Sequence, residues 1–281
     1  MRFLLALFLI SPALTFAATP HAPYSRLYVF GDSYSDIGEG YLDGDGPTAV
    51  AYLAQHFGFK LFPSNSPQIA SASLDFAVSG ARTDEGKGTK MGEFLLGYGM
   101  KNQVADFAAF VHRHKIKFVP KATLFYIAGG LNDSKLTTET TVADLKDEIK
   151  TLYSLGGRHF AVALMPTAIP GFREIGLRLN PALALIPEQL ASELPKAEIV
   201  LSHWGSFFDE VLRSPKQYGI YNTTDACAGR ALFRQDTTEC HSPSDHFYYH
   251  AEHPSTAVHK IVGEKIYREL VTATLPPDAG Q

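Results

Sequence analysis

The feature that most constrains the fold of this chain is an alternation of short apolar runs with longer stretches of helical periodicity. Five of the runs have the length of buried strands, at 27–30, 74–78, 123–128, 160–164 and 198–201. Apolar residues recur at helical spacing in longer segments, at 47–57, 102–114, 142–155 and 255–270. Strands that alternate with helices are typical of an α/β domain with a parallel sheet. The sequence therefore predicts a single doubly wound domain.

The charge of the chain gives no sign of a nucleic-acid partner. The formal net charge is -4 over 281 residues, and the lysines and arginines are scattered rather than clustered. A surface that follows a phosphate backbone needs clustered cations. We therefore expect a small-molecule substrate and no nucleic acid, and the sequence does not predict an oligomeric state.

The first residues have the pattern of an export signal. A basic start precedes an apolar run at 3–10, and small residues end the pattern at Ala17 and Ala18. The run is shorter than the ~20 apolar residues of a membrane-spanning helix. We expect a signal peptide at 1–17, a mature domain at 18–281 without a transmembrane anchor, and a secreted or periplasmic location. The alternatives are a buried N-terminal strand or an uncleaved tether.

The two cysteines of the chain lie in a segment, 214–249, that has many polar residues and little periodicity. We expect this segment to be a long functional loop. Cys227 and Cys240 are close in sequence, and in an exported protein such a pair favours a disulfide. The bridge would hold the chain that leads to His253. The alternative is two unrelated thiols.

Polar residues follow the first predicted strand, in the run Gly31-Asp32-Ser33. In an open parallel sheet, reactive residues gather at the carboxyl ends of strands. Glycine, aspartate and serine are also ordinary turn residues, so Ser33 by itself is as consistent with a helix cap as with a nucleophile. The function of Ser33 therefore depends on what surrounds it in the sequence.

Four short motifs in a fixed order resemble those of the GDSL/SGNH hydrolases. The run VFGDSYSDIG at 29–38 resembles the first block of that family, and DFAVSGA at 75–81 resembles the second. GLND at 130–133 is similar to the third block, and HPS at 253–255 is similar to the last. Three of the motifs follow predicted strands, and the fourth precedes the closing helix.

The resemblance implies a three-layer, flavodoxin-like SGNH fold and hydrolysis of carboxylic esters without a metal or an organic cofactor. It implies that Ser33 is the nucleophile and His253 the general base, because a serine hydroxyl reacts only when a base takes its proton. It implies an oxyanion hole made by the backbone N–H of Ser33, the N–H of Gly80 and the side chain of Asn132. Substrates in the family include esters of lipids, choline and acetylated sugars.

The chain departs from the family at position 250. The base is usually preceded three residues earlier by an aspartate, and here that position holds His250. A neutral His250 would accept a hydrogen bond from His253 but would bring no negative charge. We expect either a Ser–His dyad helped by a backbone carbonyl or a carboxylate from elsewhere, with Asp245 and Glu252 the nearest in sequence.

Two other classes of protein remain open at the level of sequence. Histidines, a cysteine and acidic residues crowd the C-terminal region, and such residues bind zinc in metallohydrolases; they are Cys240, His241, Asp245, His246, His250, Glu252, His253 and His259. The missing aspartate also permits a catalytically weak protein that only binds a ligand. No His-Glu-x-x-His motif is present, so we expect no metal site.

Overall fold

The computed structural model describes residues 23–67, 69–70 and 72–274. The predicted signal peptide, residues 1–17, lies outside the described residues. Within the part of the chain that is described, no helix is long and apolar enough to cross a membrane.

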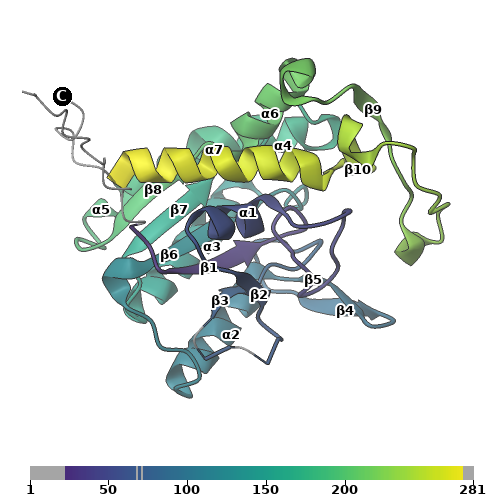
Figure 1. Ribbon diagram of the computed structural model, residues 1–281. Helices are drawn as coiled ribbons and strands as arrows, with labels where there is room; N and C mark the ends of the chain where they lie inside the picture. Colours follow the sequence, from purple (N-terminus) through teal and green to yellow (C-terminus); the bar gives the residue numbers. More distant parts are fainter. Residues whose placement is uncertain (1–22, 68, 71, 275–281) are drawn as a thin grey trace, which may run out of the picture.

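The centre of the molecule is a parallel sheet of six strands in the order β2-β3-β1-β6-β7-β8 (Figure 1). The strands are β1 (Arg26–Gly31), β2 (Leu61–Pro63), β3 (Ser73–Asp75), β6 (Thr123–Ala128), β7 (His159–Ala163) and β8 (Glu198–Ser202). All five predicted strands are present. β3 is shorter than predicted, since 76–78 is not strand, and the boundaries of the other four shift by at most one residue. The expected α/β fold with a central parallel sheet is therefore correct.

The inner strands form because both faces of the sheet are covered. Every residue of β6 is buried, and β1 is buried from Leu27 onward. The register pairs Leu27 with Leu124 and Phe30 with Ile127, so apolar side chains lie beside one another on each face. Burying one such side chain stabilises the fold by about 1.5–3 kcal/mol.

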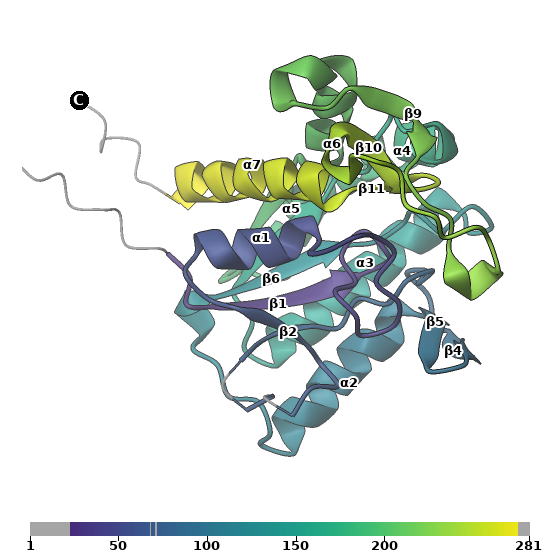
Figure 2. The same ribbon diagram turned by 45° about the vertical axis from the view of Figure 1, so that its right-hand side comes forward.

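Helices lie on both faces of the sheet. They are α1 (Ala49–His56), α2 (Met100–His112), α3 (Thr138–Ser154), α4 (Arg173–Leu183), α5 (Ile186–Ala191), α6 (Trp204–Arg213) and α7 (Thr256–Thr274). Figure 2 shows α1 and α7 side by side on one face, and α2 and α3 on the other. Close packing of α1 on α7 requires Gly263, because a Cβ there would lie 2.6 Å from the carbonyl oxygen of Ala49. The four predicted helices are α1, α2, α3 and α7.

Smaller elements complete the fold outside the central sheet. One is the hairpin of β4 (Lys87–Met91) and β5 (Phe94–Tyr98), and another is a small sheet of β9 (Asn222–Ala226), β10 (His246–His250) and β11 (His253–Pro254). Single 3-10 turns are η1 (Pro120–Ala122), η2 (Pro170–Phe172), η3 (Pro215–Tyr218), η4 (Ala231–Phe233) and η5 (Pro243–Asp245). The expectation of an aperiodic loop over 214–249 is therefore wrong in part, since β9 and β10 lie within it.

Candidate active site

Ser33 lies just beyond the carboxyl end of β1, at the point where the strand order of the sheet changes direction. β1 has β3 on one side and β6 on the other, and this is where ligands bind in open α/β sheets. The Oγ of Ser33 is 2.8 Å from Nε2 of His253. The structure thus brings together two residues that are 220 positions apart in the chain.

Two backbone N–H groups of the site have no hydrogen-bond partner among the described residues. Among the described residues, the N–H groups of Ser33 and Gly80 donate no hydrogen bond to another protein atom. Gly80 has a φ of +78°, a conformation that residues with a Cβ rarely adopt. The side-chain amide of Asn132 donates one N–H to the carbonyl of Ala81 at 2.9 Å. Since a primary amide has two N–H donors, the second stays available.

These residues line one cavity of about 220 Å³. Its wall contains Ser33, Gly80, Asn132 and His253, and the remaining lining residues are Tyr41, Asp43, Ser79, Leu96, Arg230 and Phe233. Leu96 belongs to β5 and Phe233 to η4, so the hairpin and the disulfide segment both contribute to the wall. Ser33, Gly80, Asn132 and His253 are the four residues that the family resemblance grouped into one site, and they lie together in the structure.

Two buried carboxylates hold the loops of the site. Asp36 accepts hydrogen bonds from the N–H groups of Gly38, Gly40, Tyr41 and Ser79. Asp133 accepts from the N–H and the hydroxyl of Thr83 and from the hydroxyl of Thr141. The first set joins the segment after Ser33 to the segment before Gly80, and the second fixes the chain next to Asn132.

Tyr34 connects the segment of Ser33 to the segment of His253. It follows Ser33 directly, is completely buried, and donates its hydroxyl to the carbonyl of Glu252 at 2.5 Å. Its ring centroid is 5.4 Å from that of His253. Glu252 has a φ of +63°, which is unusual for a residue with a side chain. The hydroxyl of Tyr34 thus holds the turn that presents His253.

The other ring nitrogen of His253 has two neighbours. Nδ1 lies 3.1 Å from the carbonyl oxygen of Ala251 and 2.7 Å from Nη2 of Arg230. A protonated Nδ1 donates to the carbonyl, whereas an unprotonated Nδ1 accepts from the guanidinium, so one tautomer satisfies only one of the contacts. Burial lowers the pKa of His253, and the nearby Arg230 lowers it further while Asp43 opposes this shift.

The carboxylate of the site comes from Asp43, which the sequence reasoning missed. Oδ1 of Asp43 is 2.6 Å from Nδ1 of His250, and Oδ2 is 3.3 Å from Nε2 of His253. Among the described residues His250 makes no hydrogen bond to His253. Glu252 offers its backbone carbonyl to Tyr34 rather than its side chain to His253, and the Asp245 carbonyl accepts from Tyr221.

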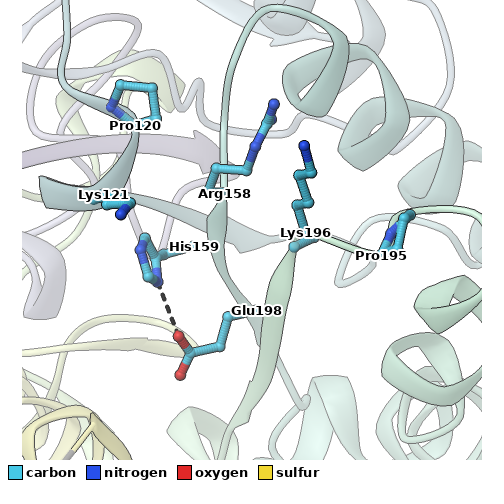
Figure 3. Close-up of a pocket in the computed structure, with 8 residues that line it drawn as sticks. Pro120, Lys121, Arg158, His159, Pro195, Lys196 and Glu198 are labelled. Carbon is cyan, nitrogen blue, oxygen red and sulfur yellow. Dashed lines mark hydrogen bonds and ion pairs between the residues drawn. The ribbon is translucent and has the colours of Figure 1, made fainter.

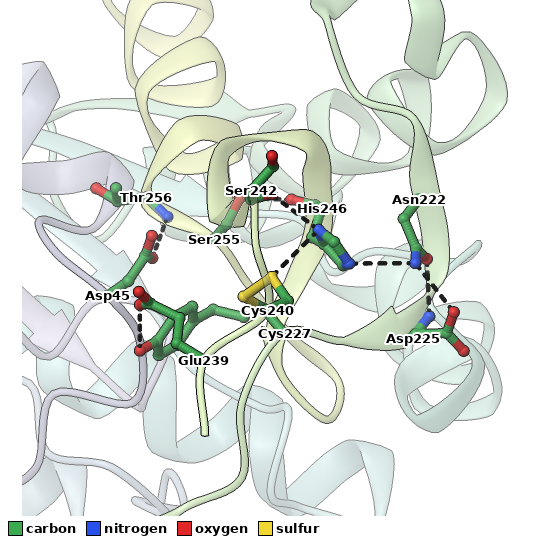
Figure 4. Close-up of a disulfide and its surroundings, with 11 residues drawn as sticks. Asp45, Asn222, Asp225, Cys227, Glu239, Cys240, Ser242, His246, Ser255 and Thr256 are labelled. Atoms are coloured by element: carbon green, nitrogen blue, oxygen red, sulfur yellow. Dashed lines mark hydrogen bonds between the residues drawn. A yellow bond between two sulfur atoms is a disulfide. The ribbon is translucent and has the colours of Figure 1, made fainter. Parts of the chain in front are cut away.

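The predicted disulfide is present (Figure 4). Cys227 and Cys240 are joined with a sequence separation of 13, in the segment that carries Arg230 and Phe233 to the cavity. In the chain-entropy model a closed loop of this size contributes roughly 3 kcal/mol. The bridge therefore supports the wall of the cavity as well as the approach to His253.

The histidines of the C-terminal region do not form one ligand set. His246 contacts the Ser242 carbonyl, His250 contacts Asp43, and the Nδ1 of buried His259 accepts from the N–H of Ala49. Within the described residues, the grouping with metal-ligand spacing is Cys227, Cys240 and His246, and its two cysteines are joined as the disulfide. The geometry gives no support to the metallohydrolase alternative.

A larger cavity lies away from this site. It measures about 690 Å³ and is lined by Lys121, Arg158, His159, Lys196 and Glu198 among others (Figure 3). His159 and Glu198 are the first residues of β7 and β8, so this cavity is at the amino ends of the strands. Ser33 is at the carboxyl ends, and the smaller cavity is the candidate active site.

Fold and site together define an α/β protein with a serine–histidine pair at the carboxyl edge of its sheet. The model of the family of GDSL-like lipases and acylhydrolases matches residues 27–266, and the chain belongs to this family. At that level it is a carboxylic ester hydrolase. The expected family is therefore confirmed.

The chain is similar to proteins of plants and bacteria at low identity. A GDSL esterase/lipase of Arabidopsis thaliana is 20% identical over 74% of this chain and 68% of the relative, and another is 21% identical over 92% and 90%. A solved GDSL-family lipolytic protein from Veillonella parvula has a TM-score of 0.47 and 12% identity, covering 89% of this chain and 99% of that one.

Proposed function

We propose that this protein is a serine esterase in which Ser33 attacks the carbonyl carbon of a carboxylic ester and His253 acts as the general base. The observation that carries the proposal is the 2.8 Å contact between the Ser33 Oγ and Nε2 of His253, in a cavity that also holds unpartnered amides. A serine hydroxyl needs such a base because it is a weak nucleophile at neutral pH.

The arrangement supports a two-step reaction. His253 takes the hydroxyl proton of Ser33 at Nε2 while the oxygen forms a bond to the ester carbon. The negative charge that develops on the ester oxygen is stabilised by the N–H groups of Ser33 and Gly80 and by Asn132. His253 then gives its proton to the departing alcohol, and a water molecule releases the acyl group from Ser33 by the same steps.

His253 performs this role in one tautomer. With the proton on Nδ1 and directed at the Ala251 carbonyl, Nε2 has a free lone pair for the Ser33 proton. This is a dyad helped by a backbone carbonyl, one of the two arrangements expected from the sequence. The second arrangement expected from the sequence was a carboxylate from another part of the chain, and Asp43 lies beside the His253 ring in this way.

The size of the cavity supports short acyl groups as substrates. A space of about 220 Å³ holds an acetyl or butyryl group more readily than a long fatty chain. A series of p-nitrophenyl esters of increasing chain length, measured with and without a chelator, tests this. We expect fastest turnover on the shortest esters and equal rates with chelator. Loss of activity with chelator and rescue by zinc would instead support a metal-dependent hydrolase.

Export is the second part of the proposal. The disulfide supports it, because such bridges persist in oxidising compartments, and so does the signal-like pattern at residues 1–17. Expression in an exporting host, followed by mass analysis of the N-terminus of the protein recovered outside the cytoplasm, tests it. We expect the chain to begin after Ala17 or Ala18, and a recovered chain that begins at Met1 would contradict cleavage.

A further inference from the structure

The structure assigns to Asp43 the role of the anion that supports the protonated base, in place of the carboxylate that the family carries three residues before the histidine. This inference rests on the proposed esterase function. It makes Asp43 a positioning residue for His253, with Arg230 as its opposing partner.

Asp43 is held beside His253 in a poorly hydrated place. Its side chain is 9% exposed and that of His253 is 13% exposed, and Oδ2 of Asp43 lies 3.3 Å from Nε2 of His253. Opposite charges interact more strongly when they are removed from water. When His253 takes the proton of Ser33 it becomes a cation, and Asp43 is the closest carboxylate to it among the described residues.

The carboxylate of Asp43 is charged and fixed. Nε of Arg230 donates to both oxygens, at 2.7 and 3.0 Å, and Nδ1 of His250 donates to Oδ1 at 2.6 Å. Burial works to raise the pKa of Asp43, but the hydrogen bond from His250 and the charges of His253 and Arg230 outweigh it and lower that pKa. His250 therefore acts through Asp43, as a donor that orients it.

Arg230 acts on the base in the opposite direction. Its Nη2 lies 2.7 Å from Nδ1 of His253, and a guanidinium cannot lose its charge. A cation in contact with the ring disfavours the imidazolium, whereas the carboxylate of Asp43 favours it. Asp43 and Arg230 form an ion pair, and their charges shift the pKa of His253 in opposite directions.

The loop that carries Asp43 is anchored to the segment of the base. Oδ1 of Asp45 accepts the N–H of Thr256, which is three residues after His253, at 2.6 Å. The hydroxyl of Thr256 donates to the carbonyl of Pro47 at 2.9 Å. Asp45 thus performs a structural task in the same loop without touching His253. It supplies a matched control for Asp43.

The test compares three variants on a p-nitrophenyl ester: Asp43→Asn, Asp45→Asn and Arg230→Gln. We expect Asp43→Asn to lower kcat by about 10- to 100-fold with KM changed less than about threefold, because the charge matters when the imidazolium forms. The acidic limb of its kcat/KM profile moves to lower pH, since His253 loses the anion that favours protonation. Arg230→Gln moves the limb to higher pH. Asp45→Asn leaves the limb in place.

Opposite shifts are a readout that a structural role would not produce. Equal losses in Asp43→Asn and Asp45→Asn with unmoved limbs would overturn the inference, as would shifts of Asp43→Asn and Arg230→Gln in the same direction. If Asp43→Asn does not fold, Asp43→Ser, which also removes the charge, takes its place, and the same shift of the acidic limb to lower pH is expected. Ser33→Ala separates the two proposals: full turnover in that variant overturns the esterase mechanism, whereas a normal Asp43→Asn beside an inactive Ser33→Ala overturns only the role of Asp43.

Discussion

At the scale of single residues, the proposed reaction depends on hydrogen-bond donors that are in place before negative charge develops on the ester oxygen. Asn132 donates one N–H to Ala81, which orients the amide so that its second N–H is available in the cavity. The N–H groups of Ser33 and Gly80, which line the same cavity, have no hydrogen-bond partner among the described residues. Donors that are fixed before the reaction favour the transition state over the bound ester, because negative charge develops on the ester oxygen only as the nucleophile attacks.

Replacement of Asn132 with alanine should therefore lower kcat by about 10²- to 10³-fold while KM stays nearly constant. Steady-state kinetics on a p-nitrophenyl ester measures both parameters. Asn102→Ala is a suitable control, since Asn102 is also an amide that holds a loop, through the N–H of Gly86, but it does not line the cavity. An effect of Asn132→Ala on KM alone would remove Asn132 from the oxyanion hole.

The residues of the site differ in how far a local sequence pattern identifies them. Ser33, Gly80, Asn132 and His253 belong to short motifs, so their grouping follows from the order of the motifs once the strands are assigned. Asp43 lies in a glycine-rich stretch with no periodicity and meets its partner 207 residues later. No local pattern predicts such a contact, although the sequence does place an aspartate, just before Gly44, ten residues after Ser33.

At the scale of elements, the buried phenol of Tyr34 connects the segment of Ser33, after β1, to the segment of His253, at β11. The ring of Tyr34 packs against Phe172, Trp204, Phe208 and His259 as well as His253. That packing fixes the ring, so its hydroxyl reaches the Glu252 carbonyl in a fixed geometry. The turn before His253 therefore depends on a residue adjacent to Ser33.

Tyr34→Phe removes only the hydroxyl and should lower kcat about tenfold, because His253 then loses part of its orientation toward Ser33. Tyr126→Phe is the matched control, since Tyr126 is equally buried and its hydroxyl contacts Ser202 at 3.0 Å, within the sheet. Both variants are expected to lose similar thermal stability. An unchanged kcat in Tyr34→Phe, with a loss of stability equal to that of the control, would show that the phenol is merely structural.

The elements that the sequence predicted are those with a strong apolar pattern. The inner strands are buried on both faces and read as apolar runs, and α1, α2, α3 and α7 have helical spacing. β2 has three residues at an edge of the sheet, and β4 is largely exposed, with the sequence KGTKM. α4 contains Pro181. Short, exposed or proline-containing elements depend on contacts with residues that are distant in the sequence. Local periodicity does not reveal such contacts.

At the scale of the whole molecule, some acidic side chains, among them Glu148 and Asp32, are buried and form no ion pair among the described residues. Both carboxyl oxygens of Glu148, on α3, are buried and lack a hydrogen-bond partner among the described residues. Burial raises the pKa of Glu148 well above its ordinary value of 4.5, and burial also raises the pKa of Asp32 to about 7. The folded protein therefore holds protons at a pH where the unfolded chain has released them.

The sign of the pH dependence follows from this difference. Above pH 4.5 the unfolded chain loses the Glu148 proton while the folded protein keeps it, so stability falls as the pH rises toward neutrality and beyond. His259 acts at lower pH: burial lowers its pKa from 6.5 to about 3, so its contribution is lost as the pH falls from 6.5 toward 3. Stability is expected to be highest in mildly acidic solution.

Glu148→Gln should remove part of this dependence. The amide has no proton to lose, so the melting temperature of Glu148→Gln should rise by a few degrees at pH 8 and change little at pH 5. In a protein of this size, each kcal/mol of stability corresponds to about 2–4 °C in melting temperature. Thermal melts monitored by circular dichroism at both pH values measure it. Asp147→Asn, an exposed neighbour on the same helix, is the control. A rise of equal size at both pH values would contradict a buried proton on Glu148.

The central claim is that Ser33 is a nucleophile activated by His253, and covalent labelling tests it most directly. The wild type, Ser33→Ala and Ser35→Ala are treated with a fluorophosphonate, and intact-protein mass spectrometry counts the adducts. Ser35 is a buried hydroxyl two residues away with no partner among the described residues, so it controls for position. We expect one adduct on the wild type and on Ser35→Ala, and none on Ser33→Ala. An adduct of equal yield on Ser33→Ala would contradict the account.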